Sequence, residues 1–93
     1  MTDKAIDVLG NSRKGFFLMV ESGQIDHGHH AGSAYNALTD TIAFSDAIRE
    51  AGESVDVSET LVIVTADHGH VFTVSGYPKR GNPILGNSSC DWR

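Results

Sequence analysis

The chain has 93 residues, of which 40% are hydrophobic and 20% are charged. This balance argues against disorder throughout and indicates one domain or part of one. Twelve acidic residues against seven Lys and Arg give a formal net charge of −5, and no basic stripe is present, so we expect no nucleic-acid partner. A single cysteine, Cys90, excludes an internal disulfide.

The first predicted elements are a short helix and a buried strand. Thr2 is a suitable N-cap for a helix that runs to about Leu9 and stops at Gly10. Residues 16–20 are continuously apolar, as in a parallel strand that is covered on both faces. The polar, glycine-containing stretch 22–33 that follows is expected to be a loop rather than a helix.

A longer helix is predicted from Ala34 to Ala51, ending at Gly52. Two apolar faces lie on opposite sides of it, so this helix needs partners on both sides. One face consists of Ala37, Thr41, Phe44, Ile48 and Ala51, and the other of Tyr35, Leu38 and Ile42. Residues 60–65 are predicted to form the second strand, and an irregular loop is expected after His70.

A strand, a helix and a second strand at this spacing make a βαβ unit, whose crossover is almost always right-handed. The predicted fold class is therefore α/β, with parallel strands whose carboxyl ends share one edge of a sheet, where such folds bind ligands. Two strings, residues 25–30 and 65–70, follow these strands and contain all five histidines. Imidazole and carboxylate ligands suit zinc and its neighbours. The residues expected to converge on one site are Glu21, Asp26, His30, Asp67 and His68.

Each of these residues also has a plainer interpretation. Glu21 could be the first solvated residue after a strand, and Asp67 could cap a turn. His27 and His29 could be exposed loop histidines, and His70 could support other ligands without binding metal itself. The plainer interpretations weaken when five such residues share one sheet edge, because a charge next to an apolar strand is costly unless it is paired or metal-bound.

Residues 15–23, 25–30 and 60–68 strongly resemble the metal-binding half of alkaline phosphatases. Gly76-Tyr77 and residues 80–86 are similar to the same family. The likeness covers residues 1–86, which we interpret as an incomplete alkaline-phosphatase-like domain, and leaves residues 87–93 as an unmatched tail. It implies part of a sandwich with a central, mostly parallel sheet, phosphate monoester substrates and a homodimer. It also implies an extracellular, cell-surface or periplasmic location.

The resemblance further implies a centre with two zinc ions and one magnesium ion. Five positions match metal ligands of the family: Glu21 for magnesium, Asp26 and His30 for the first zinc, and Asp67 and His68 for the second. His27 matches a position close to the bound phosphate. His70 matches a position behind the zinc ligands, where it would support them without binding metal. In such a centre, two metal ions clamp the attacking and leaving oxygens of a phosphoryl transfer.

The chain also departs from the family pattern. The nucleophilic serine of the family stands in an Asp-Ser-Ala context, and none of the nine serines here follows an aspartate. The upstream bridging aspartate, the phosphate-binding arginine and the downstream third ligand of the first zinc have no match either. We therefore expect a central segment of an alkaline phosphatase, cut at both ends and inactive alone. The alternatives are a non-catalytic metal-binding fragment and a related phosphodiesterase or sulfatase of the same broad superfamily.

Overall fold

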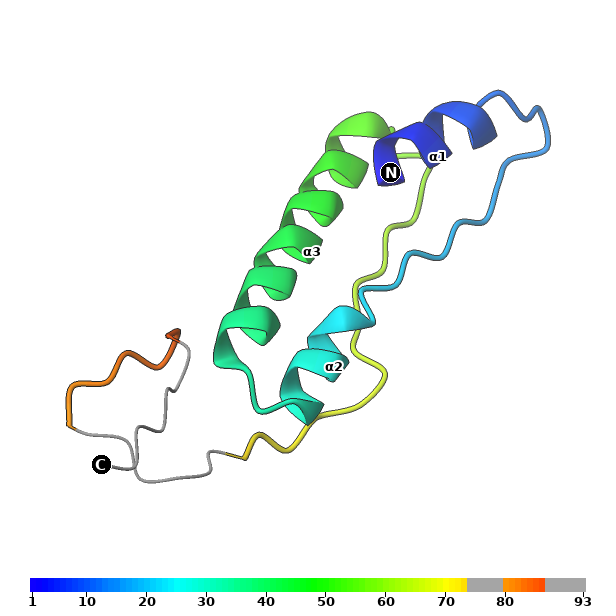
Figure 1. Cartoon of the computed structure of the whole chain (residues 1–93). Coiled ribbons are helices and arrows are strands. Elements are labelled where there is room, and N and C mark those ends of the chain that lie inside the picture. Colours follow the sequence, from blue (N-terminus) through cyan, green and yellow to red (C-terminus); the bar gives the residue numbers. More distant parts are fainter. Residues whose placement is uncertain (74–79, 87–93) are drawn as a thin grey trace.

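A computed structural model describes residues 1–73 and 80–86, and its regular structure consists of helices (Figure 1). Helix α1 spans Thr2–Leu9, α2 spans Gln24–His30 and α3 spans Ala34–Ser54. α1 lies beside the C-terminal part of α3, and α2 packs against its N-terminal part. The family-like positions 76–77 and the tail 87–93 lie outside the described residues. No helix in the described part is long and apolar enough to span a membrane.

The predicted helices over residues 2–9 and 34–51 are confirmed, with changes at their ends. α1 has the expected bounds, but its N-cap is Met1 rather than Thr2, and no side chain caps it. α3 begins where predicted because Ser33 is its N-cap, whose hydroxyl accepts a hydrogen bond from the amide of Asn36 over 3.3 Å. It continues past Gly52 as far as Ser54, since a glycine weakens a helix without always ending it.

Residues 24–30 form helix α2 where the sequence predicted a loop. A helix of seven residues is not stable by itself, so we attribute it to packing on α3. Gly28 allows this contact, because a Cβ atom there would lie only 2.7 Å from the backbone nitrogen of Ala37. The helix ends at His30, with Ala31 as its C-cap, and the chain then turns at Gly32, which has a φ of +63°. The amides of Gly32 and Ser33 then donate to carbonyl groups of the last turn.

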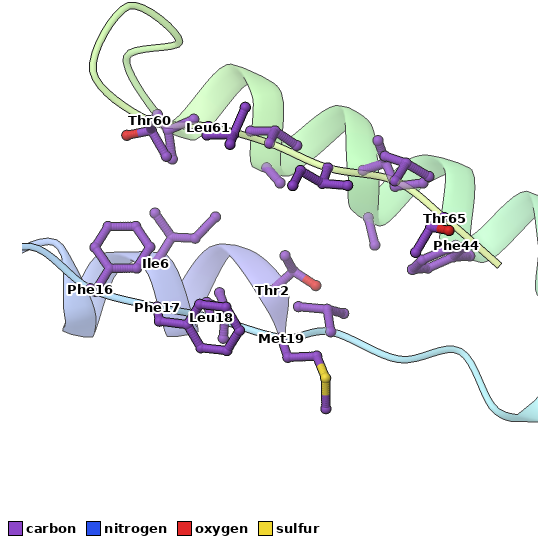
Figure 2. Close-up of a pocket in the computed structure, with 18 residues that line it drawn as sticks. Thr2, Ile6, Phe16, Phe17, Leu18, Met19, Phe44, Thr60, Leu61 and Thr65 are labelled. Atoms are coloured by element: carbon purple, nitrogen blue, oxygen red, sulfur yellow. The ribbon is translucent and has the colours of Figure 1, made fainter. Parts of the chain in front are cut away.

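The predicted α/β fold class, with a βαβ unit and a central parallel sheet, is wrong for the described residues, because they contain no strand. Residues 16–20 and 60–65 both run toward α2 (Figure 1), but no backbone hydrogen bond joins them within the described part of the chain. Figure 2 shows that they border a groove together with Ile6 and Phe44. A strand needs a hydrogen-bonding neighbour, and neither segment has one among the described residues.

The hydrophobic core is small. Ile6 and Ala37 are the buried hydrophobic residues among those that the structure describes. Of the two apolar faces of α3, the one that contains Ala37 packs against α2 and borders the groove. The opposite face remains open, with Tyr35, Leu38 and Ile42 each more than half exposed. The predicted need of α3 for partners on both faces is therefore met on one face within the described residues.

Candidate metal centre

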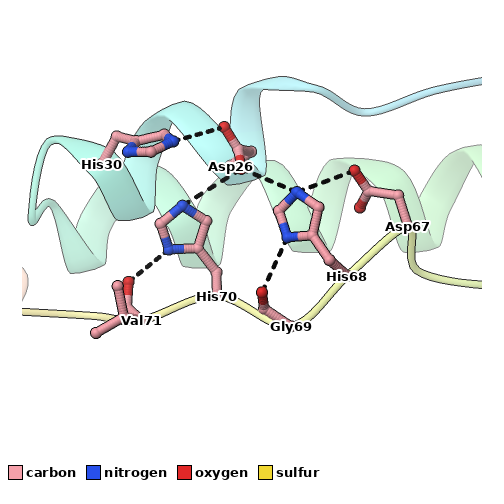
Figure 3. Close-up of polar contacts among 7 residues, drawn as sticks. All are labelled: Asp26, His30, Asp67, His68, Gly69, His70 and Val71. Atoms are coloured by element: carbon pink, nitrogen blue, oxygen red, sulfur yellow. Dashed lines mark hydrogen bonds and ion pairs between the residues drawn. The ribbon is translucent and has the colours of Figure 1, made fainter.

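Asp26 lies at the centre of the candidate site (Figure 3). It belongs to the first turn of α2, and 33% of its side chain is exposed. His30 follows one turn later, with its Nε2 atom 3.3 Å from Oδ2 of Asp26. Residues four apart on a helix are surface neighbours, so the helix itself brings these two side chains together. α2 thus presents the two residues that match ligands of the first zinc in the family that the sequence resembles.

Residues 67–70 bring two more imidazoles to the same carboxylate (Figure 3). The Nε2 atom of His70 lies 3.3 Å from Oδ1 of Asp26, and that of His68 lies 3.6 Å from the same oxygen. The Nε2 atom of His68 is also 3.2 Å from Oδ2 of Asp67. These two strings meet although the described residues form no sheet, because both extended segments lead toward α2 (Figure 1).

Asp26, His30 and His70 form a group that could hold a metal ion, since one ligand atom from each lies within 4.8 Å of the others. Imidazole nitrogen with carboxylate oxygen is a set that zinc accepts. His70 is the most shielded of the three, with 13% of its side chain exposed against 69% for His30. Its contact with Asp26 suits either a ligand or a residue that supports one.

The imidazoles of His68 and His70 face acceptors through both ring nitrogens. Nδ1 of His68 donates to the carbonyl of Gly69 over 2.9 Å, and Nδ1 of His70 lies against the carbonyl of Val71. A carbonyl only accepts, so Nδ1 carries the proton, and an uncharged ring then turns the lone pair of Nε2 toward a carboxylate. A cation or a second ring proton makes this arrangement favourable. Histidine ligands of metals commonly bond a backbone carbonyl in this way.

The raised pKa of His68 also indicates that the site favours positive charge. Its pKa is raised above the ordinary value of 6.5, chiefly because the ring bonds the carbonyl of Gly69. The charge of Asp67 raises the pKa further and that of Asp26 adds a smaller contribution, whereas loss of hydration opposes them. Because the ring is about half exposed, solvent screens these charges. The site therefore favours positive charge.

Three of the predicted site residues lie at or beyond the margin of this cluster. The side chains of Glu21 and His27 are exposed and do not belong to the group around Asp26 in the described part of the chain. Asp67 is 81% exposed and contacts the neighbouring ring of His68. The structure thus brings Asp26, His30, His68 and His70 together and leaves the proposed magnesium and phosphate residues apart.

His29 is a residue of the site that the sequence did not indicate. It is half-buried, and its ring stacks on that of His70 with the centroids 5.0 Å apart. It was interpreted as a loop histidine because residues 22–33 were not expected to be helical. The four-residue spacing of Asp26 and His30 was the one signal for a helix here, and it would have placed His29 beside the site.

A cluster of imidazoles around a carboxylate, which could hold a metal ion, lies where two extended segments meet α2, and such a cluster is compatible with a metal-binding enzyme. The sequence model of the family described as alkaline phosphatase matches residues 1–91. The chain belongs to the alkaline phosphatase family.

Curated relatives agree with this family. The tissue-nonspecific alkaline phosphatase of Felis catus is 54% identical over 86 residues, that of Rattus norvegicus 50% over 86, and that of Homo sapiens 52% over 82. These matches cover 92%, 92% and 88% of this chain. The chain spans 16% of the length of each of these relatives. No solved structure matches the chain.

Proposed function

We propose that the chain contributes metal ligands to a phosphate monoester hydrolase. In this proposal Asp26 and His30 bind one zinc ion, and Asp67 and His68 bind a second. Glu21 binds one magnesium ion, because magnesium prefers oxygen ligands. The matching positions of the alkaline phosphatase family support these assignments, and the contacts around Asp26 support the two zinc sites.

The observation that carries the proposal is the orientation of the two rings in the second string. Both Nδ1 atoms are turned to backbone carbonyls, which leaves both Nε2 atoms facing carboxylates. Uncharged rings gain nothing from this contact unless a cation lies near both partners. The residues present therefore fit a divalent cation with mixed nitrogen and oxygen ligands.

Two further residues have supporting roles in the proposal. His70 binds no metal itself in this proposal and lies behind the zinc ligands, with its Nε2 atom 3.3 Å from Oδ1 of Asp26. His27, which is exposed on α2, is proposed to lie close to the bound phosphate, because it matches such a position in the family. Divalent cations bound here would supply Lewis-acid polarisation of phosphoryl oxygens. The chain's own task is to hold these cations in place.

The activity of the whole protein is also part of the proposal. Hydrolysis of phosphate monoesters, a homodimer and a cell-surface or extracellular location follow from the family. The family match favours this activity over that of a phosphodiesterase or sulfatase. A non-catalytic, metal-binding role for the chain alone is the second candidate, and it is favoured by the lack of a serine that follows an aspartate.

Calorimetric titration of the chain with zinc at pH 8 tests the metal site. We expect weak binding, because each proposed zinc ion finds two of the three or four ligands it usually has. Asp26→Ala should lower the affinity by at least about tenfold, a loss that even supporting residues of metal sites cause. Asp46→Ala is the matched control, since it removes a carboxylate that pairs with Arg49 on α3.

The pH dependence adds a second criterion. Protons compete with zinc for imidazole, and the raised pKa of His68 means that this competition begins above pH 6.5. Binding should therefore weaken as the pH falls from 8 to 6. Equal affinities of Asp26→Ala and Asp46→Ala, or binding that does not change with pH, would show that the ligands are wrongly assigned.

A further inference from the structure

His29 has a packing arrangement that the proposed metal ligands do not share. Its ring stacks on His70 with an angle of 18° between the planes. It also meets the ring of Phe72 edge-on, with the centroids 6.0 Å apart and the planes at 84°. His29 therefore contacts two aromatic rings, that of His70 at the end of the second string and that of Phe72 just after it.

The Nδ1 atom of His29 makes no hydrogen bond in this packing. This atom is buried and has no hydrogen-bond partner among the described residues. A buried nitrogen without a partner is unfavourable, so the arrangement relies on the flat aromatic body of the ring. His29 is also absent from the group of possible metal ligands in the described part of the chain.

Both ring nitrogens of His70, in contrast, face oxygen atoms. His29 covers one face of this ring, and His30 meets it at 88° with the centroids 4.5 Å apart. These two neighbours from α2 limit the rotation of His70. In the orientation that results, Nδ1 reaches the carbonyl of Val71 and Nε2 lies 3.3 Å from Asp26.

We propose that His29 is a positioning residue that acts through His70. By stacking, it holds the His70 ring where Nδ1 reaches the carbonyl of Val71, and this contact keeps the proton on Nδ1 while Nε2 faces Asp26. The consequence for zinc rests on the proposed function, whereas the effect on the His70 ring does not depend on any metal.

The test compares His29→Phe, His29→Ala and a control, Gln24→Ala, which changes an exposed residue of the same helix. Phenylalanine keeps the stack and lacks the unused nitrogen, whereas alanine removes the stack. The first measurement is the long-range ¹⁵N–¹H spectrum of His70 in the metal-free chain at pH 8, which reports its tautomer. The second is the zinc affinity by calorimetry, and the third is the helical circular dichroism signal.

We expect the wild type, His29→Phe and Gln24→Ala to show His70 protonated at Nδ1. His29→Ala should show a mixture of tautomers and an affinity for zinc lower by about tenfold, the lower end of the loss seen for supporting residues of metal sites. His29→Phe and Gln24→Ala should keep the zinc affinity within about twofold of the wild type. Should His29→Ala lose helical signal, His29→Leu, which fills the space without a ring, replaces it and should show the same mixture.

Two results would overturn the proposal. If His29→Phe loses zinc as fully as His29→Ala, the nitrogen of His29 is itself needed and the residue is a ligand. If the tautomer of His70 is unchanged when the stack is removed, His29 does not position it. A wild-type chain that binds no zinc would refute the proposed function, and the tautomer of His70 would still decide the role of His29.

Discussion

Replacing Gly28 with alanine should weaken the packing of α2 on α3, because the two helices approach so closely at this point. The new Cβ atom would lie 2.7 Å from the backbone nitrogen of Ala37, 3.0 Å from its Cα atom and 3.2 Å from the carbonyl carbon of Asn36. All three are backbone atoms, which cannot turn aside as the tip of a side chain can. Overpacking of this kind costs about 1–3 kcal/mol.

Alanine is more favourable than glycine within a helix by about 0.5–1 kcal/mol. The control variant must therefore include the same gain in helix stability. Gly52 provides it, because it lies within α3 and a Cβ atom there would meet nothing within 4 Å. Gly52→Ala should stabilise its helix by about 0.5–1 kcal/mol. Gly28→Ala should destabilise α2 by a net amount of about 1–2 kcal/mol. The difference between the variants isolates the contact between the helices.

Amide hydrogen exchange, followed by NMR, measures the free energy of local opening for each helix. We expect faster exchange in α2 for Gly28→Ala and slower exchange near the end of α3 for Gly52→Ala. Because α2 contains Asp26 and His30, the zinc affinity should fall in Gly28→Ala and stay unchanged in Gly52→Ala. If Gly28→Ala slows exchange in α2 instead, the helices do not approach this closely, and packing on α3 does not explain α2.

Three further predictions concern catalysis, acid stability and association. With zinc and magnesium supplied, the purified chain should hydrolyse an aryl phosphate no faster than the metals alone, because no serine follows an aspartate and the covalent route needs a nucleophile; turnover that Asp67→Ala abolishes would contradict this. The pKa of Asp56 is lowered because its carboxylate accepts hydrogen bonds from the hydroxyl and amide of Ser58, so these contacts should persist above pH 3.8 and be lost as the pH falls through the lower pKa of the folded chain. An NMR titration of the Ser58 amide with a midpoint at or above 3.8 would disprove it. Phe17 and Leu61 are 88% and 84% exposed, so sedimentation velocity should show oligomers that the double variant Phe17→Lys, Leu61→Lys reduces; a monodisperse wild-type monomer would count against this.

The sequence predicts the parts of the fold whose causes are local. The stripe and the Ser33 cap of α3 lie within or next to that helix, and its start is correct for this reason. α2 was missed because seven residues that include a glycine do not form a helix alone, and the contact that stabilises them comes from Ala37. Residues 16–20 and 60–65 are extended, as their apolar character indicated, but strand formation depends on partners that a local pattern does not specify.

The contacts of the candidate site also divide into those that the sequence indicates and those that it does not. The sequence indicated that Asp26, His30 and His68 would meet, since each follows an extended apolar run and both runs lead to one place. It did not indicate that His29 would stack on His70, because this contact depends on which face α2 turns toward the second string. The assignment of Glu21 to magnesium depends on the family resemblance and stays a prediction.

The two halves of the candidate centre are distant along the chain, and this separation has a thermodynamic consequence. If His70 joins Asp26 and His30 as a ligand, as their geometry allows, the cation closes the whole loop between residues 26 and 70. Closing a loop of that length costs on the order of 4 kcal/mol in chain entropy, which is roughly a thousandfold in affinity. In chains where residues 65–70 already lie against α2, the entropy of loop closure has been lost before the cation binds. The apparent zinc affinity therefore measures the fraction of chains that are folded, and a metal titration of this protein is at the same time a folding assay.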